Sequence, residues 1–339
     1  MSILSLNQEN LKEFLKINNL PSFHLKQINE WVFKKNVLNF EQMSNLSFSL
    51  KEKLNTNLKI STLKLVKVEC AKNNETKKYL FELEDKKLIE TVLIIAPNRT
   101  TICVSSQVGC TVGCKFCASG KNGFFRNLKT YEIIEQILFV ANDLKKYPSH
   151  IVFMGMGEPL LNYDNLIESI KILSNENFLN ISQRRITVST VGIVPQIKKL
   201  KNENLKINLC LSLHASNDEI RNKIIPFSKH FPLNDILNAL KDYFETTKRD
   251  IAFEYILLEK INDSLIDAQN LYNLIKNFQC SLNLIPYNPI DDGDFIKPSS
   301  KRVEIFKKYL IDKKLNVTQR YTKGDDISAA CGQLVLKSI

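Results

Sequence analysis

The sequence predicts an α/β protein in which six βα units follow a small α-helical domain and a β-extension. Three observations predict it. After Pro97, short apolar runs alternate with segments of helical period; between Leu63 and Ile95, apolar and polar residues alternate; and before Leu63, apolar residues have the spacing of short amphipathic helices. Six βα units in series imply a parallel sheet with helices outside. Right-handed crossovers would curl that sheet into a full or partial barrel.

Residues 1–95 are predicted to form an accessory domain of helices and strands. Helical spacing relates Leu11 to Phe14 and Leu15, Ile28 to Trp31 and Val32, and Leu50 to Leu54. The segment 63–95 predicts two or three antiparallel strands, with turns near Asn73–Asn74 and near Asp85. The remainder, residues 96–339, is predicted to be the barrel domain.

Each βα unit of the barrel domain is assigned from the same change of period. The six strands are predicted at residues 101–105, 150–154, 185–189, 207–213, 251–258 and 281–287. The helices that follow them are predicted at residues 131–145, 163–174, 194–201, 233–246, 265–277 and 299–313. The proline-containing segment 288–298 is the longest loop expected.

Composition and charge narrow the class of protein. The chain has 339 residues, 44% apolar and 24% charged, as in an ordinary globular protein. The net charge of +11, from 47 basic and 36 acidic residues, favours a polyanionic partner, although a lysine-rich composition can also be a genomic habit. The start of the chain is polar, and no apolar run approaches the ~18 residues that span a bilayer. We therefore expect a cytoplasmic protein without membrane contact, whose thiols stay reduced.

Three of the eight cysteines crowd into one loop after the first barrel strand: Cys110, Cys114 and Cys117, with the spacing C-x3-C-x2-C. In a cytosolic chain this pattern indicates metal or redox chemistry. Three thiolates can hold three corners of a cubane iron–sulfur cluster, whose remaining iron is open to chelate S-adenosylmethionine (SAM). The alternatives are a fortuitous cluster or zinc. Structural zinc takes four ligands, and no fourth cysteine or histidine lies nearby in sequence.

Polar residues also stand where later strands end, on the edge where barrel enzymes hold their ligands. Gly157 and Glu158 follow the second strand; the glycine would let a ligand approach the backbone, and the acid could face an ammonium group. A plain turn is the alternative for this segment. The third, fourth and sixth strands end at Ser189, at Ser212-Leu213-His214 and at Asn288. Each of these alone could be a capping group or, for the histidine, a buried core imidazole.

Two further cysteines and one acid are singled out. Cys331 lies near the C-terminus among small residues and is either a surface cysteine or a nucleophile on an accessible loop. For Cys103, at the first barrel strand, the pattern alone favours a buried strand thiol. Glu90 lies in an alternating strand, where a solvated carboxylate is the simpler interpretation. Cys210, inside an apolar strand, is expected in the core.

Three long motifs give the chain a family resemblance. They are CVSSQVGCTVGCKFCASG from Cys103, FMGMGEPL from Phe153 and GDDISAACGQL from Gly324. With them the whole chain resembles the RlmN/Cfr family of radical SAM RNA methyltransferases. It is most similar to the RlmN branch, particularly at Pro159 and at residues 321–326. The resemblance implies a radical SAM partial barrel of the TIM type, followed by a C-terminal loop whose cysteine carries a methyl group.

The resemblance also implies roles for the residues singled out above. A 4Fe–4S cluster would be held by Cys110, Cys114 and Cys117. SAM, used twice per turnover, would contact Gly157, Glu158, Ser189, Ser212, Leu213, His214 and Asn288. Cys331 would take a methyl group from one SAM, and a radical from the second would activate that group toward the adenine. Cys103 would release the product through a transient disulfide with Cys331, and either Glu90 or Cys103 would accept the ring proton.

The same resemblance implies the substrates and partners. The expected reaction methylates carbon 2 of an adenine in the peptidyl-transferase region of 23S rRNA and of the adenosine beside the anticodon in tRNA. The expected enzyme is a monomer that receives electrons from a flavodoxin-like protein. Residues 1–95, with 15 lysines against 11 acids, are expected to contact RNA. The alternatives are Cfr-type methylation of carbon 8, a radical SAM enzyme for another substrate, which would need no Cys331, and a non-enzymatic, zinc-holding RNA-binding protein.

Overall fold

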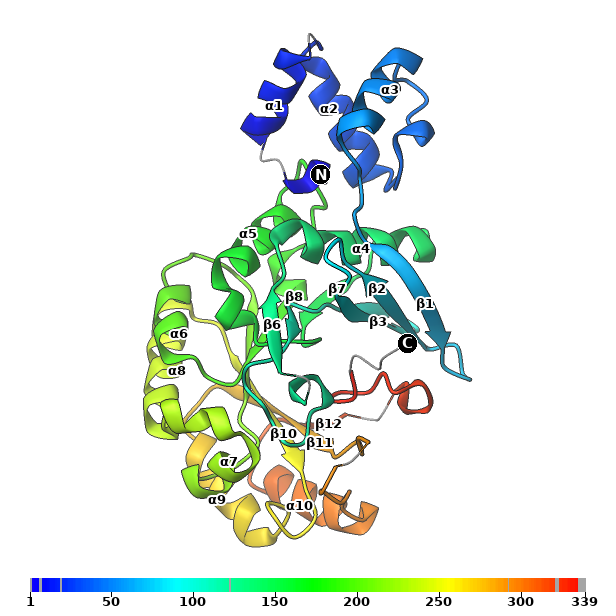
Figure 1. Ribbon diagram of the computed structural model, residues 1–339. Coiled ribbons are helices and arrows are strands. Elements are labelled where there is room, and N and C mark those ends of the chain that lie inside the picture. The colour runs from blue at the N-terminus through cyan, green and yellow to red at the C-terminus, as the bar shows by residue number, and fades with distance from the viewer. Residues whose placement is uncertain are drawn as a thin grey trace.

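A sheet of ten strands runs through the barrel and its extension (Figure 1). The computed structural model describes residues 2–5, 8–18, 20–121, 123–291, 293–320 and 323–334. The strands β1 to β4 pair antiparallel, and from β4 onward neighbouring strands are parallel. In sheet order they are β1 (Lys64–Cys70), β2 (Thr76–Glu82), β3 (Leu88–Ala96), β4 (Arg99–Cys103), β7 (His150–Phe153), β8 (Ile186–Thr190), β9 (Asn208–Ser212), β10 (Ile251–Leu257), β11 (Cys280–Pro286) and β12 (Val317–Gln319). A separate hairpin pairs β5 (Gln107–Gly109) with β6 (Phe124–Asn127).

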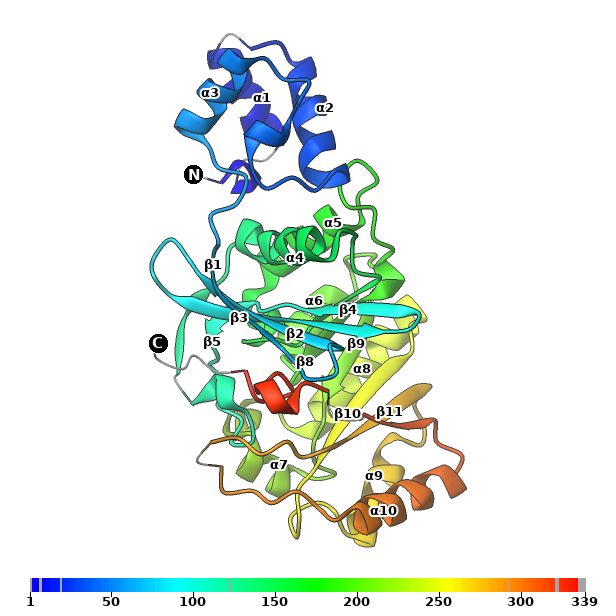
Figure 2. The ribbon, with the colours of Figure 1, turned by 90° about the vertical axis from the view of Figure 1, so that its right-hand side faces the viewer.

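Helices cover the outer face of the parallel strands (Figures 1 and 2). They are α4 (Thr130–Leu144), α5 (Tyr163–Ser174), α6 (Val194–Leu200), α7 (Asp218–Ile224), α8 (Leu233–Thr247), α9 (Leu265–Ile275) and α10 (Ser300–Asp312). Along this layer α4 packs beside α5, α6 beside α8 and α9 beside α10. Every helix in the described residues is too short or too polar to cross a bilayer.

The predicted strands and helices of the barrel are all present, with ends shifted by at most two residues. The sequence analysis missed α7, β12 and the β5–β6 hairpin. The helix α7 is only seven residues long, too short for a helical period to stand out; the side chain of Asn217 caps it by accepting a hydrogen bond from the Ile220 N–H at 2.9 Å. The strand β12 is three residues long and adds a seventh parallel strand.

A helical lobe lies at one end of the molecule, where the chain leads into β1 (Figure 2). It contains α1 (Gln8–Ile17), α2 (Phe23–Asn29) and α3 (Phe48–Asn57). The apolar residues predicted for short helices point inward there: Leu11, Leu15, Ile28, Leu50 and Leu54 are all buried. The predicted β-extension is also present, as β1, β2 and β3. Because β3 pairs with β4, the extension continues the barrel sheet, and the boundary predicted at residue 95 falls within β3.

A buried carboxylate fastens the helical lobe to the barrel. Glu135 on α4 is fully buried, and its two oxygens accept hydrogen bonds from the Ser2 and Ser61 hydroxyls, the Thr62 hydroxyl and N–H, and the Leu63 N–H. These donors come from the start of the chain and from the connection between α3 and β1. Burial raises the pKa of Glu135, and the hydrogen bonds oppose that rise. The helical lobe is thus attached to the barrel through these hydrogen bonds, and its detachment would leave the buried carboxylate of Glu135 without these donors.

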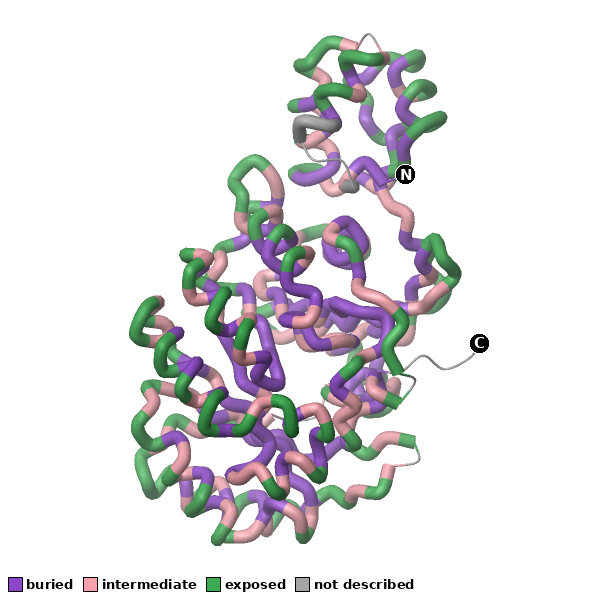
Figure 3. The backbone as a smooth tube through the Cα atoms, turned by 60° about the vertical axis from the view of Figure 1, so that its left-hand side comes forward, coloured by how far each residue is buried: buried purple, intermediate pink, exposed green. Residues whose placement is uncertain are grey.

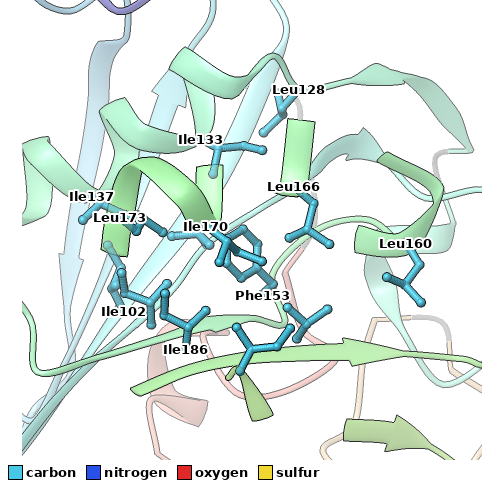
Figure 4. Close-up of a cluster of buried hydrophobic side chains, with 14 of the residues drawn as sticks. Ile102, Leu128, Ile133, Ile137, Phe153, Leu160, Leu166, Ile170, Leu173 and Ile186 are labelled. Atoms are coloured by element: carbon cyan, nitrogen blue, oxygen red, sulfur yellow. The ribbon is translucent and has the colours of Figure 1, made fainter. Parts of the chain in front are cut away.

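The hydrophobic core lies between the outer face of the strands and the helices. In Figure 4, Ile102 of β4 and Phe153 of β7 point toward Ile137 of α4 and toward Leu166 and Ile170 of α5; all five side chains are fully buried. Burying one such side chain stabilises the fold by roughly 1.5–3 kcal/mol. Figure 3 shows the same layering, with buried backbone in the strands and exposed residues on the outer helices.

The inner face of the strands is lined mainly by small and polar residues, and it borders cavities. Side chains alternate along a strand, so the neighbours of the core residues point into the barrel. Thr101 on β4 and Cys210 on β9 border one cavity, while Ser189, Ser212 and Glu254 border a second. The barrel therefore keeps its interior free for chemistry, and its stability comes from the outer layer.

Candidate active site

The cysteine-rich loop is closed by the β5–β6 hairpin. Cys110, Cys114 and Cys117 lie between its two strands. Gly109 has φ +75°, and a Cβ there would stand 1.9 Å from the carbonyl oxygen of Gly123, so this close approach of the two strands requires glycine. The backbone N–H of Cys117 donates to the carbonyl of Cys114 at 3.1 Å, which turns the second half of the loop back on itself.

The three thiols line one pocket at the carboxyl ends of the parallel strands, which we call the cysteine pocket. Most of the predicted SAM contacts line the same pocket, together with Cys331: Gly157, Glu158, Ser189, Ser212 and His214. The predicted SAM contacts come from the ends of β7, β8 and β9. The fold thus brings together groups that are up to 221 positions apart in the sequence, from Cys110 to Cys331. The hydroxyls of Ser189 and Ser212 are 3.1 Å apart.

Two of the predicted SAM contacts do not line this pocket in the described residues. The side chain of Leu213 is fully buried in the hydrophobic core, and its N–H donates to the carbonyl of Glu254 at 3.0 Å. Asn288 is also buried, and its side-chain amide donates to the carbonyl of Cys331 at 3.2 Å. In this structure Asn288 therefore positions the C-terminal segment 323–334, which we call the Cys331 loop.

The donor set of the cysteine pocket fits an iron–sulfur cluster. Thiolates are soft ligands suited to iron–sulfur clusters and to zinc. In the described part of the chain, no group of three or more His, Cys, Asp or Glu side chains converges on the position of one metal ion. The thiolates of a cubane each bind a different iron, so they need not converge in that way.

A buried arginine that the sequence analysis missed lies beside this loop. Arg221 on α7 is fully buried; its Nε donates to the Leu213 carbonyl at 3.0 Å and its Nη2 to the Val191 carbonyl at 2.5 Å. Its Nη1 finds no partner among the residues that the structure describes. Burial lowers the pKa of Arg221 to about 10, and Cys114 acts in the opposite direction. A buried cation beside Cys114 complements the negative charge that three thiolates bring to a cluster.

Glu158 is bound to the backbone around the pocket. One carboxylate oxygen accepts from the Leu160 N–H at 3.0 Å and the other from the Val191 N–H at 2.9 Å. Burial raises the pKa of Glu158 to about 7. Gly157 precedes it at φ +100°, where a Cβ would come within 2.5 Å of the Gln107 side chain. The segment is therefore a tight turn, as the alternative interpretation held, and it also borders the pocket.

His214 is held as a neutral imidazole. Its ring is buried, its backbone has φ 60°, and its Nδ1 accepts a hydrogen bond from the Ile256 N–H at 3.1 Å. The ring proton therefore sits on Nε2. Phe116 of the cysteine-rich loop packs edge-on against the imidazole, with the ring centroids 5.0 Å apart. Burial lowers the pKa of His214 to about 3.

Acidification is expected to destabilise the metal-free protein through His214. The folded-state pKa of about 3 lies below the ~6.5 of an unfolded histidine, so below pH 6.5 the unfolded chain binds a proton that the folded chain excludes. This contribution to stability is complete above pH 6.5 and is lost as the pH falls. Between pH 7.5 and pH 5.5 it amounts to about 1.4 kcal/mol of unfolding free energy.

The check is urea unfolding of the wild type and of His214→Asn at both pH values. Asparagine tolerates the left-handed backbone of this position, so the variant should fold and lose about 1.4 kcal/mol less than the wild type on acidification. An equal loss in both proteins would show that His214 is not the group responsible.

The Cys331 loop packs directly on the cysteine-rich loop. The Ala118 N–H donates to the Gly332 carbonyl at 2.7 Å, and the Ser119 hydroxyl donates to the Leu334 carbonyl at 2.7 Å. These bonds hold Cys331, an exposed residue, at the edge of the cysteine pocket, where partial enclosure of its sulfur by the protein raises the pKa of the thiol to about 12. The accessible thiol predicted from its small neighbours is therefore present.

Cys103 lies under the same loop. It is partly buried and packs against a small apolar cluster that includes Val92, Met156, Ala329 and Leu334. Burial raises the pKa of the Cys103 thiol to about 12, and the nearby Cys331 adds to the rise. The strand-thiol interpretation describes its position, while the contact with the Cys331 loop makes a role in the site possible.

Glu90 is buried, so the interpretation as a solvated carboxylate is wrong. It is 4% exposed and pairs with Lys78 at 3.2 Å. On β3 it lies two residues from Val92, which is directly opposite Cys103 on β4. Directly opposed residues share a face of the sheet, as do residues two apart on one strand. Glu90 therefore lies on the same face as Cys103.

A larger cavity, of about 900 Å³, opens at the amino ends of the parallel strands, opposite the cysteine pocket. We call it the basic cavity, because among the described residues its lining contains one acid, Asp250, and the six cations Arg99, Arg184, Lys248, Arg249, Arg320 and Lys323. Cys331, Met154 and Ile285 line both this cavity and the cysteine pocket. Cys331 thus stands where the two meet.

An ion pair marks this junction and was missed by the sequence analysis. Glu254 on β10 lines the cysteine pocket, Arg320 lines the basic cavity, and Nη2 of the arginine is 2.5 Å from Oε1 of the glutamate. The proximity of Glu254 raises the pKa of Arg320. A charged residue inside the otherwise apolar run 251–258 was the available signal for Glu254, since a buried strand carries a charge only when it is paired.

Known proteins are similar to this chain along its whole length. Residues 104–271 match the family model of the radical SAM superfamily, and residues 1–60 match that of the ribosomal RNA large subunit methyltransferase N-terminal domain. The dual-specificity RNA methyltransferase RlmN 2 of Protochlamydia amoebophila is 50% identical over 99% of this chain and 95% of its own length. The RlmN of Thermotoga maritima is 44% identical, with 100% of this chain and 98% of its own length covered. A radical SAM methyltransferase from Sphaerobacter thermophilus has a solved structure with TM-score 0.95 and 38% identity, covering 98% of this chain and 99% of that one.

Proposed function

Because the chain belongs to the RlmN family of radical SAM RNA methyltransferases, we propose that it methylates carbon 2 of adenine in two RNAs. These are the peptidyl-transferase region of 23S rRNA and tRNA, at the adenosine beside the anticodon. The relatives are named dual-specificity RNA methyltransferases, which supports two substrates. The resemblance of Pro159 and residues 321–326 to the RlmN branch supports carbon 2 as the target; Tyr321 and Thr322 lie outside the described residues.

As a member of the radical SAM superfamily, the chain takes a 4Fe–4S cluster and SAM. We assign the cluster to Cys110, Cys114 and Cys117, and SAM to the adjoining wall of the cysteine pocket. When bound, these groups supply a 5′-deoxyadenosyl radical. The neutral His214 offers an Nε2–H donor in that wall, and Gly157 keeps the backbone accessible. Leu213 can contribute only through its backbone.

The protein's own residues hold the methyl carrier. Cys331 is assigned as the carrier because it stands between the cysteine pocket and the basic cavity. Cys103 packs under the same loop, and its sulfur can attack that of Cys331, forming a disulfide while the bond to the methylated base breaks. Glu90, on the same sheet face as Cys103, is the proposed proton acceptor.

The observation that carries the RNA assignment is the basic cavity that ends at Cys331. An adenine inside folded RNA must leave its stack to reach an enclosed site. Entering from the amino ends of the strands, it would meet the carrier thiol at the inner end of the cavity. Cations at the outer end would then hold the phosphates on either side of the base. Residues 1–95 would add contacts to the body of the RNA.

Removing two cations of the cavity is expected to weaken RNA binding and its dependence on salt. Arg184 and Lys248 are exposed there, and each phosphate contact that is lost should reduce the slope of log affinity against log salt by about 0.7–1. The measurement is a salt titration of RNA binding by the double variant Arg184→Ser, Lys248→Asn. The matched control removes the exposed Lys241 and Lys308 from helices of the outer layer. Equal slopes in both double variants would contradict entry through this cavity.

The test of the function is mass spectrometry of nucleosides from rRNA and tRNA of cells with and without the gene. The proposal expects 2-methyladenosine to disappear from both RNAs. Loss of 8-methyladenosine instead would assign the Cfr reaction, and no change in either would exclude both. We also propose that the enzyme works in the cytoplasm, where its RNA substrates are, as a monomer supplied by a flavodoxin-like electron donor.

A further inference from the structure

Three charged side chains form a line from the surface of the β-extension to its buried inner face. Glu69 on β1 is partly exposed, Lys78 on β2 is buried, and Glu90 on β3 is buried. The ammonium of Lys78 is 3.0 Å from Glu69 and 3.2 Å from Glu90. Lysine is almost never buried in proteins unless it is paired. Lys78 is therefore unlike the many lysines that keep a protein surface soluble, and its position between two carboxylates indicates a specific role.

The line faces the Cys331 loop. In the antiparallel register Lys78 lies directly opposite Val92, and Val92 lies directly opposite Cys103, so all three side chains project from one face. On the same face Thr76 stands against the loop, because a Cβ at Gly324 would come within 2.7 Å of its methyl group. The other face of these strands points to α4, where Tyr79 donates a hydrogen bond to Asp143 at 2.6 Å. Lys78 and Glu90 thus belong to the reaction side of the sheet.

We propose that Lys78 is a positioning residue that keeps Glu90 ionised and aimed at the substrate. The inference rests on the proposed role of Glu90 as proton acceptor and adds a residue on which that role depends. A carboxylate enclosed by protein tends to keep its proton, and a proton acceptor has to be free of it. A cation 3.2 Å away favours the ionised form and fixes the direction of the carboxylate. Lys78 takes no part in bond making or breaking.

The other charged groups around Lys78 are engaged elsewhere. On β1, Lys67 pairs with Glu69 at 2.8 Å. On the Cys331 loop, Asp326 accepts from the Lys72 N–H at 2.8 Å, Asp325 accepts from the Gln333 side chain at 2.6 Å, and Lys323 pairs with Glu75 at 2.9 Å. From β4 the charged and titratable groups on this face are Arg99 and Cys103, and Arg99 donates to the Thr101 hydroxyl at 3.1 Å. Lys78 joins Glu90 in an ion pair at 3.2 Å.

The test compares Lys78→Met with Lys67→Met. Both variants remove a lysine from Glu69, but only the first removes the cation beside Glu90. Each protein is first loaded with methyl at Cys331, verified by intact mass, and then reacted with RNA in a single turnover across a range of pH. Methyl loading should be the same in both, because Lys78 has no role in that step.

The expected result is an acid limb of the rate profile that moves up by about 1 to 3 pH units in Lys78→Met and stays in place in Lys67→Met. Deuterium at carbon 2 of the target adenine should slow Lys78→Met more than the wild type, because proton removal becomes limiting. Lys78→Arg should show the wild-type pH profile, because arginine keeps the cation beside Glu90. If Lys78→Met folds poorly, Lys78→Arg becomes the test variant. A shifted pH profile in Lys78→Arg would then count against the proposal.

Two results would overturn the inference. One is a pH profile and isotope effect in Lys78→Met that match those of Lys67→Met. The other is a wild-type rate in Glu90→Gln, which would remove the premise that this carboxylate accepts the proton. Failure of the proposed function itself is distinguishable, because the wild-type protein would then form no methylated adenine in the same assay.

Discussion

Replacing Cys331 by alanine is expected to abolish RNA methylation and leave the fold and the iron content unchanged. Cys331, Met154 and Ile285 are the described residues that line both the cysteine pocket and the basic cavity. Of the three, Cys331 has the strongest nucleophile once its thiol is ionised. Removing a covalent nucleophile typically lowers turnover by several orders of magnitude. The loop should keep its shape, because its contacts run through backbone groups such as the Gly332 carbonyl.

The measurement is methyl transfer from labelled SAM to RNA, together with iron content and formation of 5′-deoxyadenosine. Cys280→Ala is the matched control: this cysteine is partly buried at the start of β11 and borders neither cavity in the described lining. The control should methylate RNA at the wild-type rate. Methylated RNA from Cys331→Ala at a comparable rate would refute the carrier role.

The barrel could be predicted because its elements follow local rules. Ile102, Phe153 and Ile186 repeat the same pattern of a short apolar run before a helical segment, and the outer helices bury the residues that their period selects. The helices and strands that escaped prediction are short: α7 has seven residues, β12 and β5 have three each, and β6 has four. Segments of that length form because the surrounding structure supplies caps and partner strands, and a local pattern contains neither.

The site was predictable where residue type alone restricts the chemistry. Thiols in the spacing of Cys110, Cys114 and Cys117 have few uses in a reduced compartment, so the sequence was enough to predict metal or redox chemistry at this loop. Arg221 and Lys78 give no such signal, because lysine and arginine are common on surfaces. Only the fold shows that α7 places Arg221 in the interior and that β2 places Lys78 between two acids.

The alternation of side chains along the strands explains which of the predicted strand-end residues line the cysteine pocket and which do not. Ser189, Ser212 and His214 end strands whose side chains alternate inward at that level, and they line the cysteine pocket. Leu213, between two of them in sequence, points the opposite way and fills the core, as the alternation requires. Asn288 lies beyond its strand end and reaches the Cys331 loop. Register within the strand decides which residue faces a ligand, and proximity in sequence does not.

Replacing Cys114 by serine is expected to remove the iron and, with it, every reaction of the enzyme. Cys114 is the central thiol of the three, it lies beside the buried Arg221, and a hydroxyl is a harder and much weaker ligand for iron than a thiolate. Burial raises the pKa of the Cys114 thiol well above its usual value, so without metal this position holds a neutral group. The serine variant should therefore fold, remain colourless, and contain iron only at background level.

The control for this variant is Cys70→Ser, an exposed cysteine on β1 that is remote in sequence from the loop and should leave the iron content unchanged. RNA binding provides a second readout that separates the two ends of the barrel. Four cations of the basic cavity, Arg99, Arg184, Lys248 and Arg249, lie at the amino ends of the strands, so Cys114→Ser should bind RNA with the affinity and salt dependence of the wild type. The contrary outcome is that the wild-type protein, isolated without oxygen, contains zinc in place of iron and that Cys114→Ser loses this zinc. That result would support the zinc-holding alternative and contradict the radical mechanism. A colourless but RNA-competent Cys114→Ser would instead show that substrate capture and radical generation are built on opposite edges of one sheet and meet at Cys331.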